Sequence, residues 1–97
     1  YSGYGDVFCQ EWPFEGVTER GPIEAQGAAP ILVIGTTGDP ATPYVWARRL
    51  ADQLASGVLV TYNGEGHTAY AGGSACVNNA VDAFLLEGTA PAEDPNC

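Results

Sequence analysis

The fold of this chain is decided by the stretch PILVIGTTGDPATP at residues 30–43. Residues 31–34 are a continuous run of branched aliphatic side chains, which is typical of a strand covered on both faces in a parallel sheet. The turn after this strand is rich in Gly and Thr and contains Asp39. Thr42 is then expected to cap a helix that begins with Pro43, because the first helical position needs no N–H.

A helix, a second strand and a loop are expected after this turn. Residues 43–55 carry apolar side chains at helical spacing, and these form one predicted buried stripe: Ala47, Leu50, Ala51 and Leu54. Gly57 suits the C-terminal stop of this helix. A second strand is predicted at residues 58–62, and the glycine-rich loop at residues 63–73 contains the only histidine, His67.

A second helix completes the pattern. Ser74 is expected to cap it and Gly88 to end it, and its predicted buried stripe is Val77, Ala80, Val81, Phe84 and Leu85. The order strand, helix, strand, helix favours an α/β fold with a parallel pair and a right-handed crossover. Two strands with one helix each do not make a stable sheet, so we expect one edge to pair with a strand outside this sequence.

The composition limits the number of domains in the chain and the partners that it is expected to bind. Its 97 residues make at most one domain. Twelve acidic residues against three basic ones give a net charge of −9, and such a surface repels phosphate backbones. Nucleic acid is therefore not an expected partner. No membrane span is expected, because the apolar runs are about five residues long and a spanning helix needs roughly 20.

The chain divides into a lead-in at residues 1–29 and an ordered part at residues 30–97. The lead-in shows no sustained periodicity and is expected to be irregular. It contains five aromatic residues, which are Tyr1, Tyr4, Phe8, Trp12 and Phe14. We expect them to anchor the lead-in on a core supplied from elsewhere, and ligand stacking is the alternative.

Asp39 and His67 each follow a predicted strand, and functional groups of open α/β sheets gather at that end of the strands. Asp39 is expected to accept a hydrogen bond from His67 Nδ1–H, while His67 Nε2 acts as general base and then general acid. Acid before histidine is the order of the last two members of an α/β-hydrolase triad. The nucleophile belongs in an earlier G-x-S-x-G turn, and this sequence contains none. This chemistry requires no cofactor and no metal.

Other interpretations of these residues stay open. Gly-Asp-Pro is a common turn, and a lone histidine in a glycine-rich loop is usually exposed polar surface. Glu65 is a reserve candidate for the acid. The segment GGSAC at residues 72–76 differs from a nucleophile elbow at one position, but helix capping explains Ser74 better.

Three cysteines, Cys9, Cys76 and Cys97, indicate an oxidising compartment, because closely spaced pairs typical of zinc sites are missing. A bridge between Cys76 and Cys97 would pin the tail onto the last helix, and two unrelated free thiols are the alternative. Cys9 would then need a partner elsewhere.

At these residues the chain resembles the C-terminal domain of the tripeptidyl aminopeptidase-like (TAP-like) proteins, which are secreted, mostly actinobacterial α/β-hydrolases related to prolyl aminopeptidases. The resemblance covers roughly residues 28–97. It is carried by PILVIGTTGDPATP at residues 30–43, ARRLA at residues 47–51, VLVTYNGEGHTAY at residues 58–70 and the tail pattern from Ser74 to Cys97. It implies the C-terminal strand–helix–strand–helix part of an α/β-hydrolase fold, completed by a segment outside this chain.

The resemblance also implies roles for individual residues. Asp39 would be the triad acid, His67 the triad base, and Cys76 would form a disulfide with Cys97. The activity implied is that of a serine peptidase releasing short peptides from N-termini, or of a related esterase, located in the cell envelope or outside the cell. The nucleophile elbow, oxyanion-hole loop and substrate-selecting cap of that family are missing, so this chain is not expected to be active alone.

Two functions of different classes follow from the sequence. The first is an enzyme part that completes a hydrolase whose serine lies on another segment and whose substrate is a peptide or an ester. The second is a non-catalytic module that binds a partner through its open sheet edge, with a structural role in the cell envelope as a weaker form.

Overall fold

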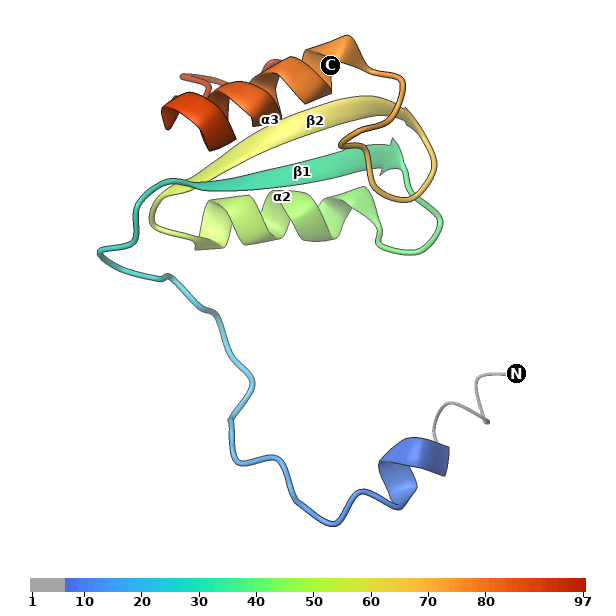
Figure 1. The fold of residues 1–97 in the computed structure, drawn as a ribbon. Helices are drawn as coiled ribbons and strands as arrows, with labels where there is room; N and C mark the ends of the chain where they lie inside the picture. The colour runs from blue at the N-terminus through green and yellow to red at the C-terminus, as the bar shows by residue number, and fades with distance from the viewer. Residues whose placement is uncertain (1–6) are drawn as a thin grey trace.

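The computed structural model describes residues 7–97, in which strands and helices alternate. The elements are β1 (Ile31–Gly38), α2 (Tyr44–Gln53), β2 (Gly57–Glu65) and α3 (Ala75–Glu87). β1 and β2 pair in parallel, and α2 lies on one side of the pair with α3 on the other (Figure 1). The predicted α/β class, with parallel strands and helices packed on the sheet, is confirmed.

Alternation of side chains along the strands assigns one face of the sheet to each helix. On one face, Val60 of β2 is fully buried in a cluster with Val77 and Val81 of α3. On the other face, Gly35 of β1 lies so close to α2 that a Cβ there would be 2.7 Å from the Cβ of Ala47. The core therefore consists of two thin layers, one on each side of the strands.

Both strands run further than predicted. β1 extends to Gly38 and β2 to Glu65, beyond the predicted ends at residues 34 and 62. The prediction of a loop at residues 63–65 is therefore wrong. The two strands stay paired over this extension, with an irregularity just before the pair Gly38 and Glu65. Pairing with a neighbouring strand recruits polar residues that their own propensity does not place in a strand.

Two boundary predictions for α2 are wrong. Thr42 does not cap the helix, because Pro43 is the N-cap and no side chain caps the N-terminus. The Thr42 hydroxyl donates instead to Asp39. Gly57 does not stop the helix but begins β2. A Cβ at position 57 would collide with the carbonyl group of Ala51, so glycine lets the new strand start directly against the end of α2.

Both predicted ends of α3 are confirmed. Ser74 is the N-cap, and its hydroxyl accepts a hydrogen bond from the Val77 amide at 3.2 Å. Gly88 is the C-cap in the left-handed region, at a φ of 70°, which a residue without Cβ adopts without strain.

The predicted buried stripes of the two helices are confirmed only in part. In α3, Val77 and Val81 are buried, but Leu85 is 65% exposed. In α2, Ala51 is buried, but Leu50 is 43% exposed. Helical spacing predicts the direction of a stripe, whereas its width depends on which elements pack against the helix.

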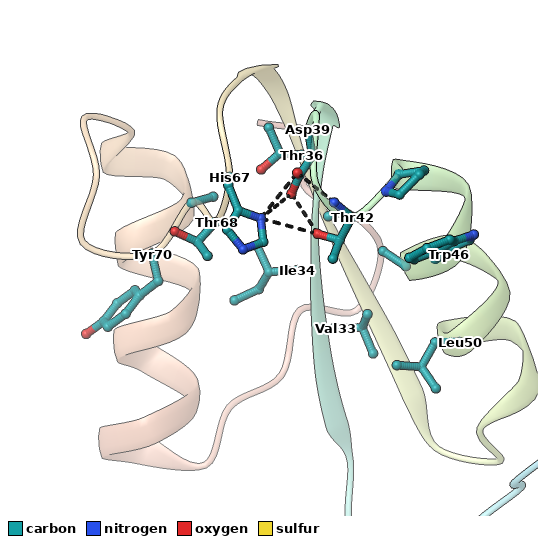
Figure 2. A pocket seen from close by; sticks show the side chains of 14 residues that line it. Val33, Ile34, Thr36, Asp39, Thr42, Trp46, Leu50, His67, Thr68 and Tyr70 are labelled. Carbon is teal, nitrogen blue, oxygen red and sulfur yellow. Dashed lines mark hydrogen bonds and ion pairs between the residues drawn. The ribbon is translucent and has the colours of Figure 1, made fainter. Parts of the chain in front are cut away.

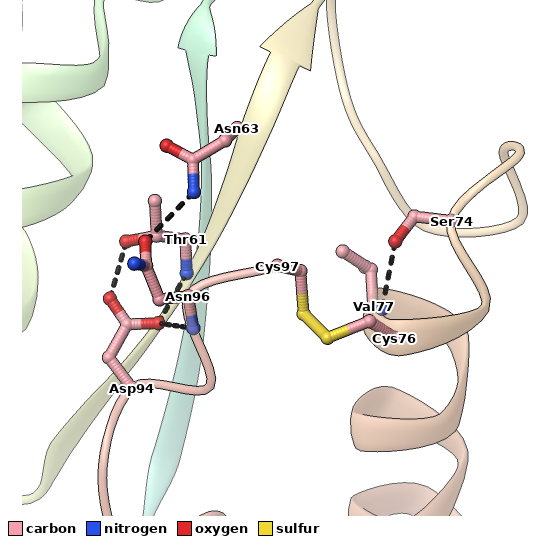
Figure 3. Close-up of a disulfide and its surroundings, with 8 residues drawn as sticks. All are labelled: Thr61, Asn63, Ser74, Cys76, Val77, Asp94, Asn96 and Cys97. Carbon is pink, nitrogen blue, oxygen red and sulfur yellow. Dashed lines mark hydrogen bonds between the residues drawn. A yellow bond between two sulfur atoms is a disulfide. The ribbon is translucent and has the colours of Figure 1, made fainter.

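The C-terminal tail is fastened to α3 and to β2. Cys76 and Cys97 form a disulfide, with their Cα atoms 5.6 Å apart. The Cys97 amide donates to the Thr61 carbonyl at 2.7 Å, and the Asp94 carboxylate accepts from the amide and the hydroxyl of Thr61 (Figure 3). Hydrogen bonds to the desolvated Asp94 carboxylate outweigh its burial and lower its pKa. Within the described residues, Cys9 is the free thiol, and it is exposed.

The two edges of the sheet therefore differ. The tail occupies the outer edge of β2 around Thr61. β1 has β2 on one side and, within residues 7–97, no strand on the other. The sequence predicts a strand from outside this chain at one edge without specifying which, and the structure leaves the β1 edge open.

The lead-in runs away from the two layers (Figure 1). Residues 7–10 form a helical turn, and the aromatic side chains of Phe8, Trp12 and Phe14 are all more than two-thirds exposed. Tyr1 and Tyr4 lie outside the described residues. Anchoring of these aromatic residues on another core stays a prediction. Among residues 7–97, no helix has the length and apolar character that crossing a membrane requires.

Candidate active site

Asp39 and His67 meet at one end of the sheet. Asp39 follows β1 directly and His67 lies two residues after β2. Because the strands are parallel neighbours, both loops leave the sheet at the same end. His67 Nδ1 lies 3.0 Å from Asp39 Oδ2 and 3.2 Å from Oδ1 (Figure 2). The structure thus brings together the two residues that the sequence singles out.

The Asp39 carboxylate is surrounded by donors from the turn between β1 and α2. Its Oδ1 accepts from the amides of Ala41 at 2.8 Å and Thr42 at 2.9 Å. Its Oδ2 accepts from the Thr42 hydroxyl at 2.9 Å. The side chain is 6% exposed.

These donors keep the Asp39 carboxyl ionised. The Thr42 amide lowers its pKa most, and burial opposes this change. The Ala41 amide, the His67 ring and the Thr42 hydroxyl lower the pKa further, to well below its ordinary range. A charged acceptor therefore stands next to the imidazole across the neutral pH range.

The loop after β2 aims the His67 ring. Gly66 and Thr68 on either side of it have φ values of 120° and 69°, so the chain turns sharply there. Beyond the turn, the Tyr70 hydroxyl donates to Asp82 of α3 at 2.6 Å, and this carboxylate raises the pKa of Tyr70. The Ala71 amide donates to the Asn78 side chain of α3 at 2.9 Å. These two hydrogen bonds, from Tyr70 and from Ala71, fix the loop to the helix.

This geometry defines what His67 can do. The carboxylate beside Nδ1 accepts its proton in a hydrogen bond, so the neutral ring carries its hydrogen on Nδ1. Nε2 is then the basic nitrogen, and the side chain is 53% exposed. Such a ring is able to take a proton from an alcohol that approaches from outside.

The described serines do not provide that alcohol. Ser74 caps α3, and the Ser56 hydroxyl donates to the carbonyls of Ala28 and Ala29. Glu65, the reserve acid, belongs to the end of β2, while Asp39 holds the ring.

An apolar groove of about 490 Å³ borders the Asp39–His67 pair. Consecutive β1 residues from both faces of the strand line it, so it runs along the open edge of β1. Trp46 and Leu50 of α2 form one wall, and they are 57% and 43% exposed. Tyr70 contributes to the lining from the His67 loop (Figure 2).

Thr42 is the residue of this site that the sequence does not assign to it. Its position before Pro43 predicts a helix cap, but its hydroxyl and its amide both bind Asp39. The signal for this role is the spacing Asp-x-x-Thr, which brings the hydroxyl back to the carboxylate across one turn.

The profile of the family described as TAP-like protein matches residues 1–97. The chain is 38% identical over 89 residues to serine protease Hip1 of Mycobacterium tuberculosis. It is 39% identical over 89 residues to carboxylesterase B of the same species, and 31% identical over 90 residues to tripeptidyl aminopeptidase of Streptomyces lividans. Each match covers 92% of this chain and 17% of the relative, so the chain spans about a sixth of their length.

Proposed function

Because the chain belongs to the TAP-like family of α/β-hydrolases, we propose that it forms the C-terminal part of a secreted serine hydrolase. In this proposal Asp39 is the acid and His67 the base of a charge-relay triad, and the serine lies outside the chain. The observation that carries the proposal is the 3.0 Å contact between Asp39 Oδ2 and His67 Nδ1 at the shared end of two parallel strands.

The first half of the proposed reaction, which acylates the serine, contains two proton transfers; in the second half water attacks the acyl-serine ester with the same two transfers, which releases the acid and regenerates the serine. His67 Nε2 takes the proton of the serine hydroxyl as the serine attacks the carbonyl carbon, and then gives it to the leaving group. Asp39 keeps the other proton on Nδ1 and stabilises the imidazolium that forms between the two steps. The nucleophile and the donors that bind the oxyanion are contributed by the rest of the hydrolase.

The open edge of β1 supports the proposed partner. A strand from the rest of the hydrolase would pair there, and its side chains would cover Trp46 and Leu50 in the apolar groove. The same edge borders Asp39 and His67, so a segment that pairs with β1 enters next to the site.

The proposed substrates are peptides with free N-termini, from which short peptides are released. The relative named tripeptidyl aminopeptidase supports a peptidase. The second candidate is an esterase, because the relative named carboxylesterase B shares 39% of its aligned residues with this chain. Both activities use the same triad, so the substrate cap, rather than the Asp39–His67 pair, distinguishes them.

The proposed location is the cell envelope or the medium outside the cell. The disulfide between Cys76 and Cys97 supports this, because disulfides persist in oxidising compartments and are rare in reducing ones.

The test uses the complete hydrolase, with tripeptidyl p-nitroanilides and p-nitrophenyl esters as substrates. Asp39→Asn and His67→Gln are expected to lower kcat by about 10⁴-fold with little change in KM, since both remove transition-state stabilisation. Asp52→Asn changes an exposed carboxylate of α2 and serves as the control. If both site variants hydrolyse these substrates at the wild-type rate, the triad assignment is wrong and the non-catalytic module is favoured.

A further inference from the structure

We propose that Thr42 is a positioning residue that locks the Asp39 carboxylate and, through it, the proton on His67 Nδ1. The inference rests on the proposed function, because it assigns a role within the same triad. It starts from the fact that one residue contacts both oxygens of the carboxylate and lies within 3.4 Å of the imidazole.

The contacts of Thr42 divide between the two carboxylate oxygens. Its amide donates to Asp39 Oδ1 at 2.9 Å, and its hydroxyl donates to Oδ2, also at 2.9 Å. Rotation of the carboxylate about its terminal bond would break at least one of these hydrogen bonds. The Ala41 amide also binds Oδ1, so the hydroxyl is the contact that holds Oδ2 toward His67.

The same hydroxyl faces the imidazole. Because its hydrogen points to Asp39 Oδ2, the lone pairs of Thr42 Oγ1 are free to face His67 Nδ1, which lies 3.4 Å away. The Nδ1 proton therefore lies among three oxygens, two of Asp39 and one of Thr42 (Figure 2). All three favour the ring form with hydrogen on Nδ1 over the form with hydrogen on Nε2.

The α2 helix does not use the Thr42 hydroxyl as a cap, so this hydroxyl is available to the site. Pro43 is the N-cap of α2 and no side chain caps that end, so the hydroxyl is not used by the helix. A residue before proline is restricted to extended backbone, and this restriction helps to fix the direction of the Thr42 side chain. Thr42 is exposed, so replacing its hydroxyl with a methyl group does not disturb the core.

The test follows the His67 imidazole in the complete hydrolase, with ¹⁵N-histidine confined to residues 1–97 by segmental labelling. His67 is the only histidine of these 97 residues, so the ¹⁵N signals report one ring without ambiguity. At about pH 8.5, where an ordinary histidine is neutral, the wild type is expected to show hydrogen on Nδ1. Thr42→Val should populate the form with hydrogen on Nε2, and Thr42→Ser should restore the wild-type spectrum. Thr89→Val, an exposed change after α3, is the matched control.

Two results would overturn the inference. The first is a Thr42→Val spectrum identical to that of the wild type, and the second is a Thr42→Ser spectrum that matches Thr42→Val. A wild-type ring with the same proportion of hydrogen on Nδ1 and Nε2 as free histidine would overturn the inference as well. In that case neither the Asp39 oxygens nor Thr42 Oγ1 would hold the proton on Nδ1.

A second readout uses the complete hydrolase. Thr42→Val is expected to lower kcat about tenfold with KM unchanged, and Thr42→Ser to recover most of the loss, because the lost contact is one hydrogen bond to a charged group. An unchanged kcat in Thr42→Val would contradict the inference. The ¹⁵N experiment needs no nucleophile or substrate. A spectrum that shifts as expected in a protein without hydrolytic activity would therefore refute the proposed function and leave the role of Thr42 intact.

Discussion

Asp39 shows how a single side chain takes part in both folding and the proposed chemistry. Its carboxylate is nearly excluded from solvent, yet four donor groups from three residues make the ionised form the favoured one. Three of these donors come from the chain just after it, so the turn and the charge stabilise each other.

The first prediction concerns the pH dependence of this carboxylate. Since the pKa of Asp39 is lowered in the folded state, its ionised form stabilises the fold above the unfolded-state pKa. That contribution is lost as the pH falls through the folded-state pKa. A site-resolved ¹³C titration is expected to show Asp39 ionising below the exposed carboxylates. Between about pH 5 and pH 2, the free energy of unfolding should fall less in Asp39→Asn than in the wild type.

Asp52→Asn is the control for this measurement, because Asp52 is an exposed carboxylate of α2 that lies away from the site. If Asp39 titrates together with the exposed carboxylates, the hydrogen bonds from Ala41 and Thr42 do not hold it ionised.

The second prediction concerns the core layer under α3. Val77 is fully buried, and truncating it removes apolar area and leaves a cavity between α3 and β2. Val77→Ala is therefore expected to lower the free energy of unfolding by about 2 kcal/mol, measured by urea denaturation. Val17→Ala removes the same atoms from a side chain that is 96% exposed and should have no measurable effect. Equal losses in both variants would show that this layer does not stabilise the fold.

At the scale of residues, the sequence predicted the Asp39–His67 pair but not the contacts of Thr42 with that pair. Asp39 and His67 were identifiable because each follows a strand and parallel strands end together. The role of Thr42 was missed, because threonine before proline also fits a helix cap. Only the path of the turn decides which partner its hydroxyl reaches.

At the scale of elements, both helices and both strands were predicted in the right order. Their existence follows from local patterns, namely the aliphatic runs and the helical spacing. Their lengths do not: β1 and β2 extend over polar residues because each pairs with the other. Gly57 is another feature that local patterns do not predict, because its close approach to α2 depends on how β2 packs against that helix.

The third prediction concerns the link between α3 and the tail. The disulfide closes a loop with a sequence separation of 21 residues, which in the chain-entropy model contributes about 3 kcal/mol. The double variant Cys76→Ser, Cys97→Ser is expected to lose about this much stability in urea denaturation. Hydrogen exchange at the amide of residue 97 should accelerate, because its bond to Thr61 loses its covalent support.

Cys9→Ser is the matched control, since within residues 7–97 this exposed thiol takes part in no disulfide. A double variant as stable as the control would show that the hydrogen bonds of Asp94 and Cys97 hold the tail without the covalent link.

At the scale of the whole molecule, the chain presents two of the three proposed triad residues next to a β1 edge that has no partner strand within residues 7–97. The acid and the histidine are in place, whereas Ser56 and Ser74 serve other structural roles. The incomplete sheet was predictable from the number of strands. The sequence did not predict which edge of the sheet stays open, because this depends on where the C-terminal tail docks.

The fourth prediction follows from this incompleteness. A serine-directed fluorophosphonate probe is expected to leave the 97-residue chain unlabelled and to label the complete hydrolase, as read by intact mass. The reason is that the hydroxyls of Ser56 and Ser74 face backbone groups instead of a general base. Labelling of Ser74 in the isolated chain would show that this sequence carries its own nucleophile.

The docked tail has a consequence for self-association. A sheet with two exposed edges is able to add copies of itself without limit, which is the geometry of a fibril. In the part of the chain that the structure describes, Asp94 and Cys97 occupy the hydrogen-bonding groups of Thr61 at the β2 edge, which leaves the β1 edge for growth. Two copies that met through β1 would each cover the other's free edge, and the assembly would stop at a dimer.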